Sequence, residues 1–140
     1  VGILQGDILT RPKHGVLSYH HGDIREYRGG APAGFWQHLN DEEYAGVTLQ
    51  RLNEELDAGE IVAFNKVSID DADTWYEVQE RMFSASIPML KEGIETIEDS
   101  EEEPITVPES ELGEMYYRSD WTVWARLRSR IKDFTNSHLF

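Results

Sequence analysis

The sequence predicts an α/β domain, because short strand-like runs bounded by glycine and proline alternate with longer stretches of helical periodicity. Its 140 residues suffice for one well-formed core, so a second independent domain is not expected. The chain contains no cysteine, which excludes a disulfide framework and a thiolate metal site. We therefore expect one α/β unit at residues 1–98, followed by an acidic linker and a helical tail at residues 99–140.

Three runs have the composition of strands. Residues 16–19 form a short apolar and aromatic run flanked by glycines. Residues 47–52 and 61–69 form two more, and the turn at residues 57–59 makes them a hairpin or a closely spaced pair. Together these runs supply the predicted sheet.

Helical spacing marks three further segments. A short helix is expected over residues 35–40 and a long one over residues 73–97, where Pro88 should kink it or split it. Residues 99–103 hold four carboxylates and one serine, which is typical of a solvated linker rather than a metal site. A last helix is expected over residues 120–134. We expect packing in the core or at an interface for the aromatic residues Tyr116, Tyr117, Trp121 and Trp124. The alternative is that they stack on a substrate.

The charge balance narrows the class of partner. Thirteen basic against twenty-seven acidic side chains leave a formal net charge of −14, which repels nucleic acid and anionic membranes. No apolar run is long enough to span a membrane. Arginine outnumbers lysine, which fits a halophilic interior and equally an ordinary acidic protein. We expect a cytoplasmic protein that acts on a small molecule, with no nucleic-acid or membrane partner.

His20 and Asp57 form a candidate acid–base pair near the end of the first predicted strand. His20 ends the first strand, where ligands bind in open α/β sheets, and Asp57 lies in a turn whose Gly59 permits a tight bend. A carboxylate in contact with the imidazole would fix its tautomer, as in an acid–base catalyst. The alternative is a surface histidine and a carboxylate favoured only by its turn. Side chains alternate along a strand, so Ser18 and His20 share one face while His21 takes the other, which argues against a shared metal ion.

An ordered set of motifs resembles the folate-dependent formyltransferase family, which includes the methionyl-tRNA and glycinamide ribonucleotide formyltransferases. The family pattern runs Asn-x-His, Tyr-Arg-Gly, a proline-started helix with an aromatic residue, Gly-Val-Thr and Asp-x-Gly-x-Ile. The matching segments lie within roughly residues 1–70 and are Ser18-Tyr19-His20, Tyr27-Arg28-Gly29, Pro32 with Phe35-Trp36, Gly46-Val47-Thr48 and Asp57-Ala58-Gly59-Glu60-Ile61. The resemblance implies a Rossmann-like formyltransferase fold, of which this chain holds the second half.

The resemblance also implies roles for single residues. It implies that His20 assists proton transfer while an amine attacks the formyl carbon of 10-formyltetrahydrofolate, with Asp57 as its support and Ser18 at the position of the family's Asn. The residues that it places beside the folate are Ile3, Leu4, Asp57, Ala58 and Gly59. Those that it places beside the acceptor are His21, Tyr27, Arg28 and Trp36. It implies no metal.

The reaction that the resemblance implies is a one-carbon transfer, in which a formyl group passes to a small amine, for example an amino sugar on a nucleotide. Two alternatives stay open. His21 directly after His20 is seen in the related formyltetrahydrofolate deformylases, which release formate to water. Ser18 replaces an amide that would hold the developing oxyanion, which favours a folate-binding or assembly module with impaired catalysis. The chain begins at the last folate loop of the family domain, so we expect a longer protein, self-association or a second chain to complete the site.

Overall fold

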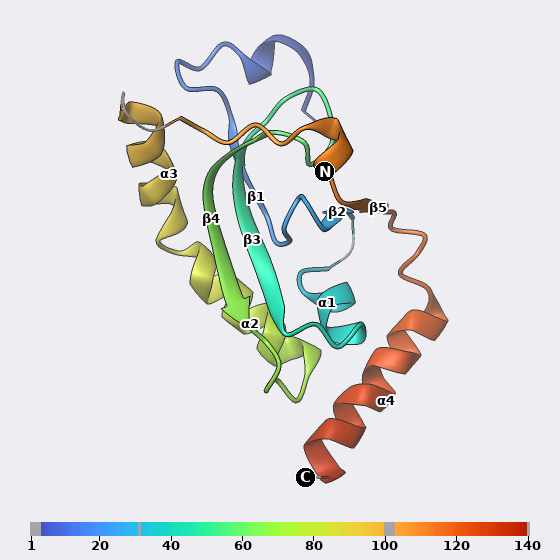
Figure 1. The fold of residues 1–140 in the computed structure, drawn as a ribbon. Coiled ribbons are helices and arrows are strands. Elements are labelled where there is room, and N and C mark those ends of the chain that lie inside the picture. The colour runs from blue at the N-terminus through green and yellow to red at the C-terminus, as the bar shows by residue number, and fades with distance from the viewer. Residues whose placement is uncertain (1–3, 31, 100–102, 140) are drawn as a thin grey trace.

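The computed structural model describes residues 4–30, 32–99 and 103–139. Within these residues the chain forms a three-stranded sheet, a two-stranded sheet and four α-helices (Figure 1). The elements in chain order are η1 (Gly6–Leu9), β1 (Leu17–His20), β2 (Tyr27–Gly29), α1 (Phe35–Leu39), β3 (Tyr44–Arg51), β4 (Glu60–Ser68), α2 (Trp75–Ser86), α3 (Met89–Glu98), η2 (Glu109–Glu111), β5 (Glu114–Tyr116) and α4 (Val123–Leu139). None of the helices described here is both long and apolar enough to cross a membrane.

The main sheet is antiparallel, with the strand order β1-β3-β4. The predicted strand pair is confirmed, although β3 begins at Tyr44 because pairing with Ser68 extends the ladder beyond the apolar run. In the β1–β3 register, Ser18 lies opposite Gln50 and His20 lies opposite Thr48. Directly opposed residues of antiparallel strands point to the same side, so these four side chains share one face of the sheet.

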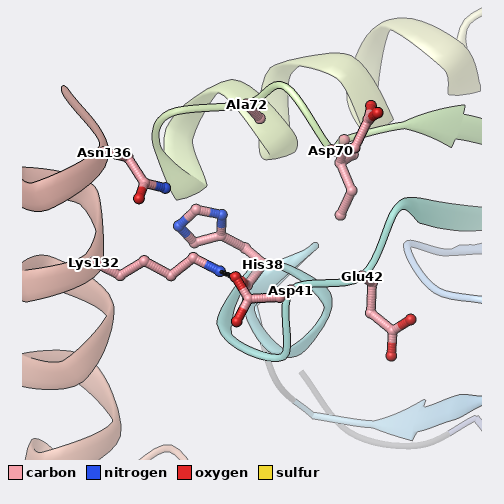
Figure 2. Close-up of a pocket in the computed structure, with 8 residues that line it drawn as sticks. His38, Asp41, Glu42, Asp70, Ala72, Lys132 and Asn136 are labelled. Atoms are coloured by element: carbon pink, nitrogen blue, oxygen red, sulfur yellow. Dashed lines mark hydrogen bonds and ion pairs between the residues drawn. The ribbon is translucent and has the colours of Figure 1, made fainter. Parts of the chain in front are cut away.

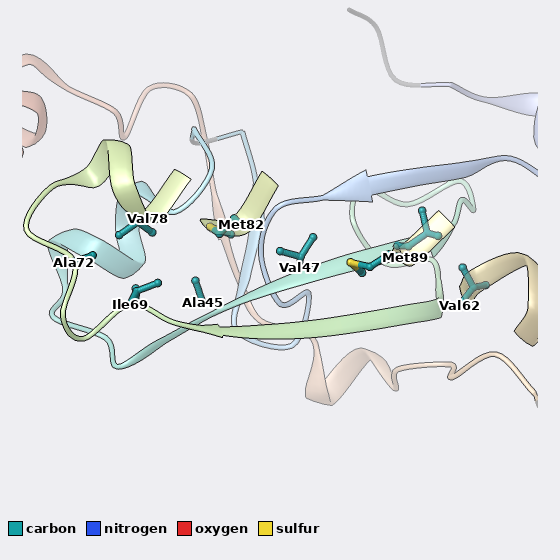
Figure 3. Close-up of a cluster of buried hydrophobic side chains, with 9 residues drawn as sticks. Ala45, Val47, Val62, Ile69, Ala72, Val78, Met82 and Met89 are labelled. Carbon is teal, nitrogen blue, oxygen red and sulfur yellow. The ribbon is translucent and has the colours of Figure 1, made fainter. Parts of the chain in front are cut away.

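Helices α2 and α3 cover the other face of the sheet, and the apolar core lies between them and the strands (Figures 1 and 3). Gly93 lets α3 approach closely, since a Cβ atom there would lie 2.7 Å from Leu49 Cδ2. The helix predicted over residues 73–97 starts at the cap of Thr74 and is split at Pro88, as expected. The buried core residues are Ala45, Val47, Leu49, Val62, Ile69, Ala72, Val78, Met82 and Met89.

The segment of residues 21–26 follows β1 and is fixed against the sheet by the Gly-Val-Thr motif. The hydroxyl of Thr48 is buried and donates to the carbonyl of Gly22 at 2.8 Å. A Cβ atom at Gly46 would lie 2.8 Å from Asp23 Cβ, so only glycine lets the segment lie this close. Asp23 in turn accepts three hydrogen bonds from Arg25. The motif therefore holds the chain that directly follows His20.

The C-terminal part of the chain packs back against the segment that follows β1. Strand β5 pairs in parallel with β2, a contact that the sequence pattern did not predict. Helix α4 runs beside α1, away from the main sheet (Figure 1), and is longer than the predicted residues 120–134. The linker expected at residues 99–103 falls largely outside the described residues, and the division of the chain at residue 98 stays a prediction.

Candidate active site

The imidazole of His20 lies at the end of β1 and contacts two oxygen atoms. Its Nε2 is 2.7 Å from the backbone carbonyl of Tyr27, and its Nδ1 is 3.4 Å from Asp57 Oδ2. A carbonyl can only accept, so Nε2 carries a proton and Nδ1 is the nitrogen left to take up a second one. Both side chains are 13% exposed, which shields the pair from solvent. The structure thus brings together the two residues that the sequence proposes as an acid–base pair.

The carboxylate of Asp57 is held on both oxygens. Oδ1 accepts a hydrogen bond from the side-chain amide of Gln50 at 3.0 Å, and Oδ2 accepts one from the backbone N–H of Gly29 at 2.9 Å. Asp57 has a φ of 47°, in the left-handed region that non-glycine residues rarely adopt. The Gln50 side-chain oxygen also accepts from the backbone N–H of Gly59 at 3.0 Å, so one buried amide fixes both the turn and the carboxylate.

The ring of His20 has little room on the side of Gly22. A Cβ atom at Gly22 would lie 2.6 Å from His20 Nε2 and 3.1 Å from the Tyr27 carbonyl oxygen. Any larger residue at this position would therefore push the imidazole away from its present partners. The structure assigns Gly22 the role of leaving space for the ring.

The residues that the family resemblance places beside the acceptor gather around His20. His21, Tyr27, Arg28 and Trp36 all line one small pocket with it, of about 20 Å³. Arg28 is already engaged, because its Nε donates to the carbonyl of Gly113 at 3.0 Å and its Nη1 contacts Glu55 Oε1 at 3.3 Å. The other residues of the wall are Gly29, Pro32, Gln37 and Tyr116.

Two nitrogen atoms in this wall are buried without a partner among the described residues, His21 Nε2 and Trp36 Nε1. The ring of His21 packs edge-on against Phe83 at 4.7 Å. Its burial, and secondarily the charge on His20, lowers the pKa of His21 from its ordinary value. Burial also raises the pKa of Tyr27 to about 12, so its phenol stays protonated and donates to Glu42 Oε1 at 2.8 Å.

The remaining predicted residues lie around this pair. Ser18 shares the face of His20 two residues earlier on β1, and Ile3 lies outside the described residues. Leu4 is 46% exposed and precedes Gly6, whose backbone N–H donates to Glu54 Oε1 at 3.0 Å. This contact joins the N-terminal loop to the turn that carries Asp57. Ala58 of that turn lines a cavity of about 490 Å³ between the two segments.

Sequence reasoning missed Gln50 and gave Tyr116 a place in the site only as an alternative to packing. Gln50 looks like any polar residue on a strand face, and only the β1–β3 register and the turn after β3 bring it to Asp57. Tyr116 reaches the pocket through the unpredicted pairing of β5 with β2. The sequence marks Gln50 only by its position two residues after Thr48, on the same face of the strand, whereas no local signal marks Tyr116.

A second pocket, of about 150 Å³, lies between α1 and α4 (Figure 2). Lys132 of α4 bonds the carbonyl of His38 and the carboxylate of Asp41, and Asp133 lies 2.7 Å from His38 Nε2. The Asp133 carboxylate also accepts from the backbone N–H of Trp75 at 3.2 Å, at the start of α2. Burial lowers the pKa of His38, while the hydrogen bond to Asp133 opposes this. The cluster anchors α4 on the domain.

The protein is thus a mixed α/β domain with a histidine–aspartate pair at the end of β1. Residues 1–93 match the family model described as Formyl transferase, and the chain belongs to that family. A methionyl-tRNA formyltransferase of Thermodesulfovibrio yellowstonii is 35% identical over 115 residues, which cover 82% of this chain and 36% of that protein. One from Clostridioides difficile is 35% identical over 97 residues, or 69% of this chain and 31% of that protein. The chain thus spans about a third of the length of these relatives.

Solved structures share the fold. The formyltransferase PseJ of Anoxybacillus kamchatkensis, in complex with UDP-4,6-dideoxy-4-formamido-L-AltNAc and tetrahydrofolate, has a TM-score of 0.71 at 24% identity and covers 86% of this chain and 62% of that chain. An N-formyltransferase of Helicobacter canadensis, in complex with folinic acid and dTDP-3-aminofucose, has a TM-score of 0.67 at 20% identity, over 85% of this chain and 47% of that chain. These similarities establish part of a Rossmann-like formyltransferase fold.

Proposed function

We propose that the protein transfers a formyl group from 10-formyltetrahydrofolate to a small amine, with an amino sugar on a nucleotide as the favoured acceptor. The observation that carries this proposal is the contact between His20 Nδ1 and Asp57 Oδ2, in a carboxylate clamp formed by Gln50 and Gly29. Family membership supports the reaction class, and the sugar-nucleotide ligands of two solved structures support the acceptor class.

His20 acts as the proton carrier in this proposal. As the amine nitrogen bonds to the formyl carbon, it must lose a proton, and His20 Nδ1 is the ring nitrogen able to accept it. Asp57 then faces an imidazolium, which its carboxylate stabilises by charge. When the bond between the formyl carbon and N10 of the donor breaks, the same proton passes to that nitrogen. His20 returns to its neutral form, so no net proton is left on the protein.

We place a folate donor beside this pair. The donor supplies the activated formyl carbon, and the chain supplies the walls that hold it. The loop containing Leu4 and the turn containing Asp57, Ala58 and Gly59 are joined by the hydrogen bond from Gly6 to Glu54. The cavity bordered by Ala58 lies between the same two segments. We place the donor on this side of His20, with the acceptor on the side of Tyr27 and Trp36.

Hydrolysis is the second candidate function. The pocket of about 20 Å³ beside His20 is close to the space needed by one water molecule. A water acceptor would make the protein a deformylase, in which the half-buried His21 lines the space for the water. Equal rates of formate release with and without candidate amines would favour hydrolysis, whereas formamide product that appears only with an amine would favour transfer.

The central test is His20→Ala, assayed by release of tetrahydrofolate from 10-formyltetrahydrofolate. Loss of the proton carrier should lower the rate by about 10²–10⁴-fold. His138→Ala is the matched control, because His138 lies on an exposed part of α4 and should leave the rate unchanged. Turnover by His20→Ala at the rate of the control would contradict the proposal.

A further inference from the structure

Tyr116 places an aromatic ring in the wall of the candidate active site. Its ring centroid is 5.5 Å from that of Tyr27 and 5.0 Å from that of Trp36, in stacked and tilted arrangements. All three residues line the pocket that contains His20. Tyr116 belongs to β5, which lies beyond the residues that match the family model. The ring therefore adds to the site something that the matched part of the chain does not contain.

The backbone at Tyr116 is fixed in place. Its carbonyl accepts a hydrogen bond from Gly30 N–H at 2.9 Å. A Cβ atom at Gly29 would lie 2.0 Å from the same carbonyl oxygen, so only glycine allows this approach. At the start of the strand, a Cβ atom at Gly113 would lie 2.3 Å from the backbone of Glu26. Two glycines and the β2–β5 pairing thus hold the Cα of Tyr116 beside the pocket.

The side chain of Tyr116 is held much less firmly than its backbone. Its hydroxyl donates to Glu114 Oε2 at 3.2 Å, which is an exposed partner two residues away on the same strand. The ring is otherwise held by its contacts with Tyr27 and Trp36. Rotation about the Cα–Cβ bond would release the ring while the strand stays in place, because no hydrogen bond to a distant element would break.

The pocket beside His20 holds no more than about one water while the ring is in this position. An amine larger than water that enters this pocket fully would displace a group from the wall. The Tyr116 ring can move while its backbone stays in place, because its hydroxyl is bonded to the exposed Glu114 of the same strand. The space that it would leave is bounded by the two aromatic residues, which suits the flat face of another ring.

We propose that the slot filled by the Tyr116 ring, between Tyr27 and Trp36, is the acceptor subsite, and that it takes the ring of an amine-bearing pyranose in place of the phenol. This inference rests on the proposed formyl transfer at His20. The buried Nε1–H of Trp36 and the Nε2 of His21 lack partners among the described residues, and hydroxyl groups of a sugar supply both a donor and an acceptor for them. Tyr116 then decides which acceptors enter.

The test compares equilibrium binding of dTDP-3-aminofucose and of folinic acid by titration calorimetry, so that no turnover is required. Tyr116→Ala removes the competing ring and should tighten binding of the amino sugar by at least about fivefold, since two aromatic contacts no longer have to be broken. Tyr116→Phe keeps the ring and should bind like the wild type. Tyr117→Ala is the matched control, because Tyr117 is 63% exposed and lies outside the pocket wall.

Folinic acid separates failure of this inference from failure of the proposed function. Unchanged folinic acid affinity in all variants, with tighter amino-sugar binding only in Tyr116→Ala, supports the subsite. The subsite is overturned if Tyr116→Ala binds the amino sugar no more tightly than the wild type, or if the wild type does not bind it. Folinic acid binding would in that case still support the donor site. Absence of folinic acid binding by the wild type overturns the proposed function itself. Tyr116→Leu keeps an apolar side chain without the ring and replaces the alanine variant if thermal melting shows that variant unfolded.

Discussion

Gln50 donates a hydrogen bond to Asp57 Oδ1 at 3.0 Å through an amide that is 1% exposed. The other end of the same amide accepts the backbone N–H of Gly59 at 3.0 Å, so Gln50 links the carboxylate to the turn that carries it. Asp57 needs such support because its backbone is in the left-handed region. The orientation of the carboxylate toward His20 therefore depends on a residue that contacts neither the imidazole nor a substrate.

Gln50→Glu tests this positioning role with little change in volume. At pH 8 the new carboxylate cannot donate to Asp57 and repels it, so activity should fall by about ten- to a hundredfold relative to the wild type. At pH 5.5 protonation restores a donor, and part of the relative loss should be recovered. Gln79→Glu on α2 is the control for adding a charge. A loss that is equal at both pH values would show that Gln50 serves packing alone.

Gly22→Ala tests whether the site needs the space beside His20. The added methyl group would lie 2.6 Å from His20 Nε2, so the ring must move away from the Tyr27 carbonyl. We expect kcat to fall by about tenfold or more, because a displacement of about 1 Å at a catalytic group is this costly. Gly30→Ala is the control, since a Cβ there meets nothing closer than 3.7 Å. Equal kcat values for the two variants would contradict the assigned role of Gly22.

The elements with a strong local pattern could be predicted from the sequence. Apolar runs bounded by glycine predicted the strand that ends at His20, and they also predicted the two strands on either side of the Asp57 turn. Apolar spacing and Pro88 predicted the two helices over the core. The predicted strands alone did not bring His20 and Asp57 together, because their contact depends on the pairing of β1 with β3. The family resemblance raised this contact above the alternative of two unrelated surface residues.

The pairing of β2 with β5 could not be predicted in the same way. Each strand has three residues, too few for a periodic signal, and the partners are far apart in the chain. Their approach depends on the missing Cβ atoms of Gly29 and Gly113, which act only once the backbones meet. For this reason Tyr116 was expected only in packing or, as an alternative, in stacking on a substrate.

Ser18→Asn tests whether the serine limits activity. An asparagine at this position would add an amide donor two residues before His20, on the face of β1 that both residues share. If catalysis is impaired for want of that donor, the formyl transfer rate should rise by about 10²-fold. Ser18→Ala distinguishes the contribution of the hydroxyl and should lower the rate further. A rate unchanged by both substitutions would show that position 18 does not contact the developing oxyanion.

The half-buried His21 should make the fold sensitive to acid. The pKa of His21 is lowered in the folded state, mainly by burial and to a smaller extent by the charge on His20. The unfolded chain therefore protonates this imidazole more readily than the folded protein does. Stability therefore falls as the pH drops below the ordinary histidine pKa of about 6.5 toward the lower value in the folded protein, and it is kept above that window. His21→Phe keeps an aromatic ring beside Phe83 and cannot be protonated. The decrease in melting temperature between pH 7.5 and pH 5 should be smaller for this variant than for the wild type or for His138→Phe. Equal decreases in the three proteins, measured by scanning calorimetry, would show that other groups determine the acid response.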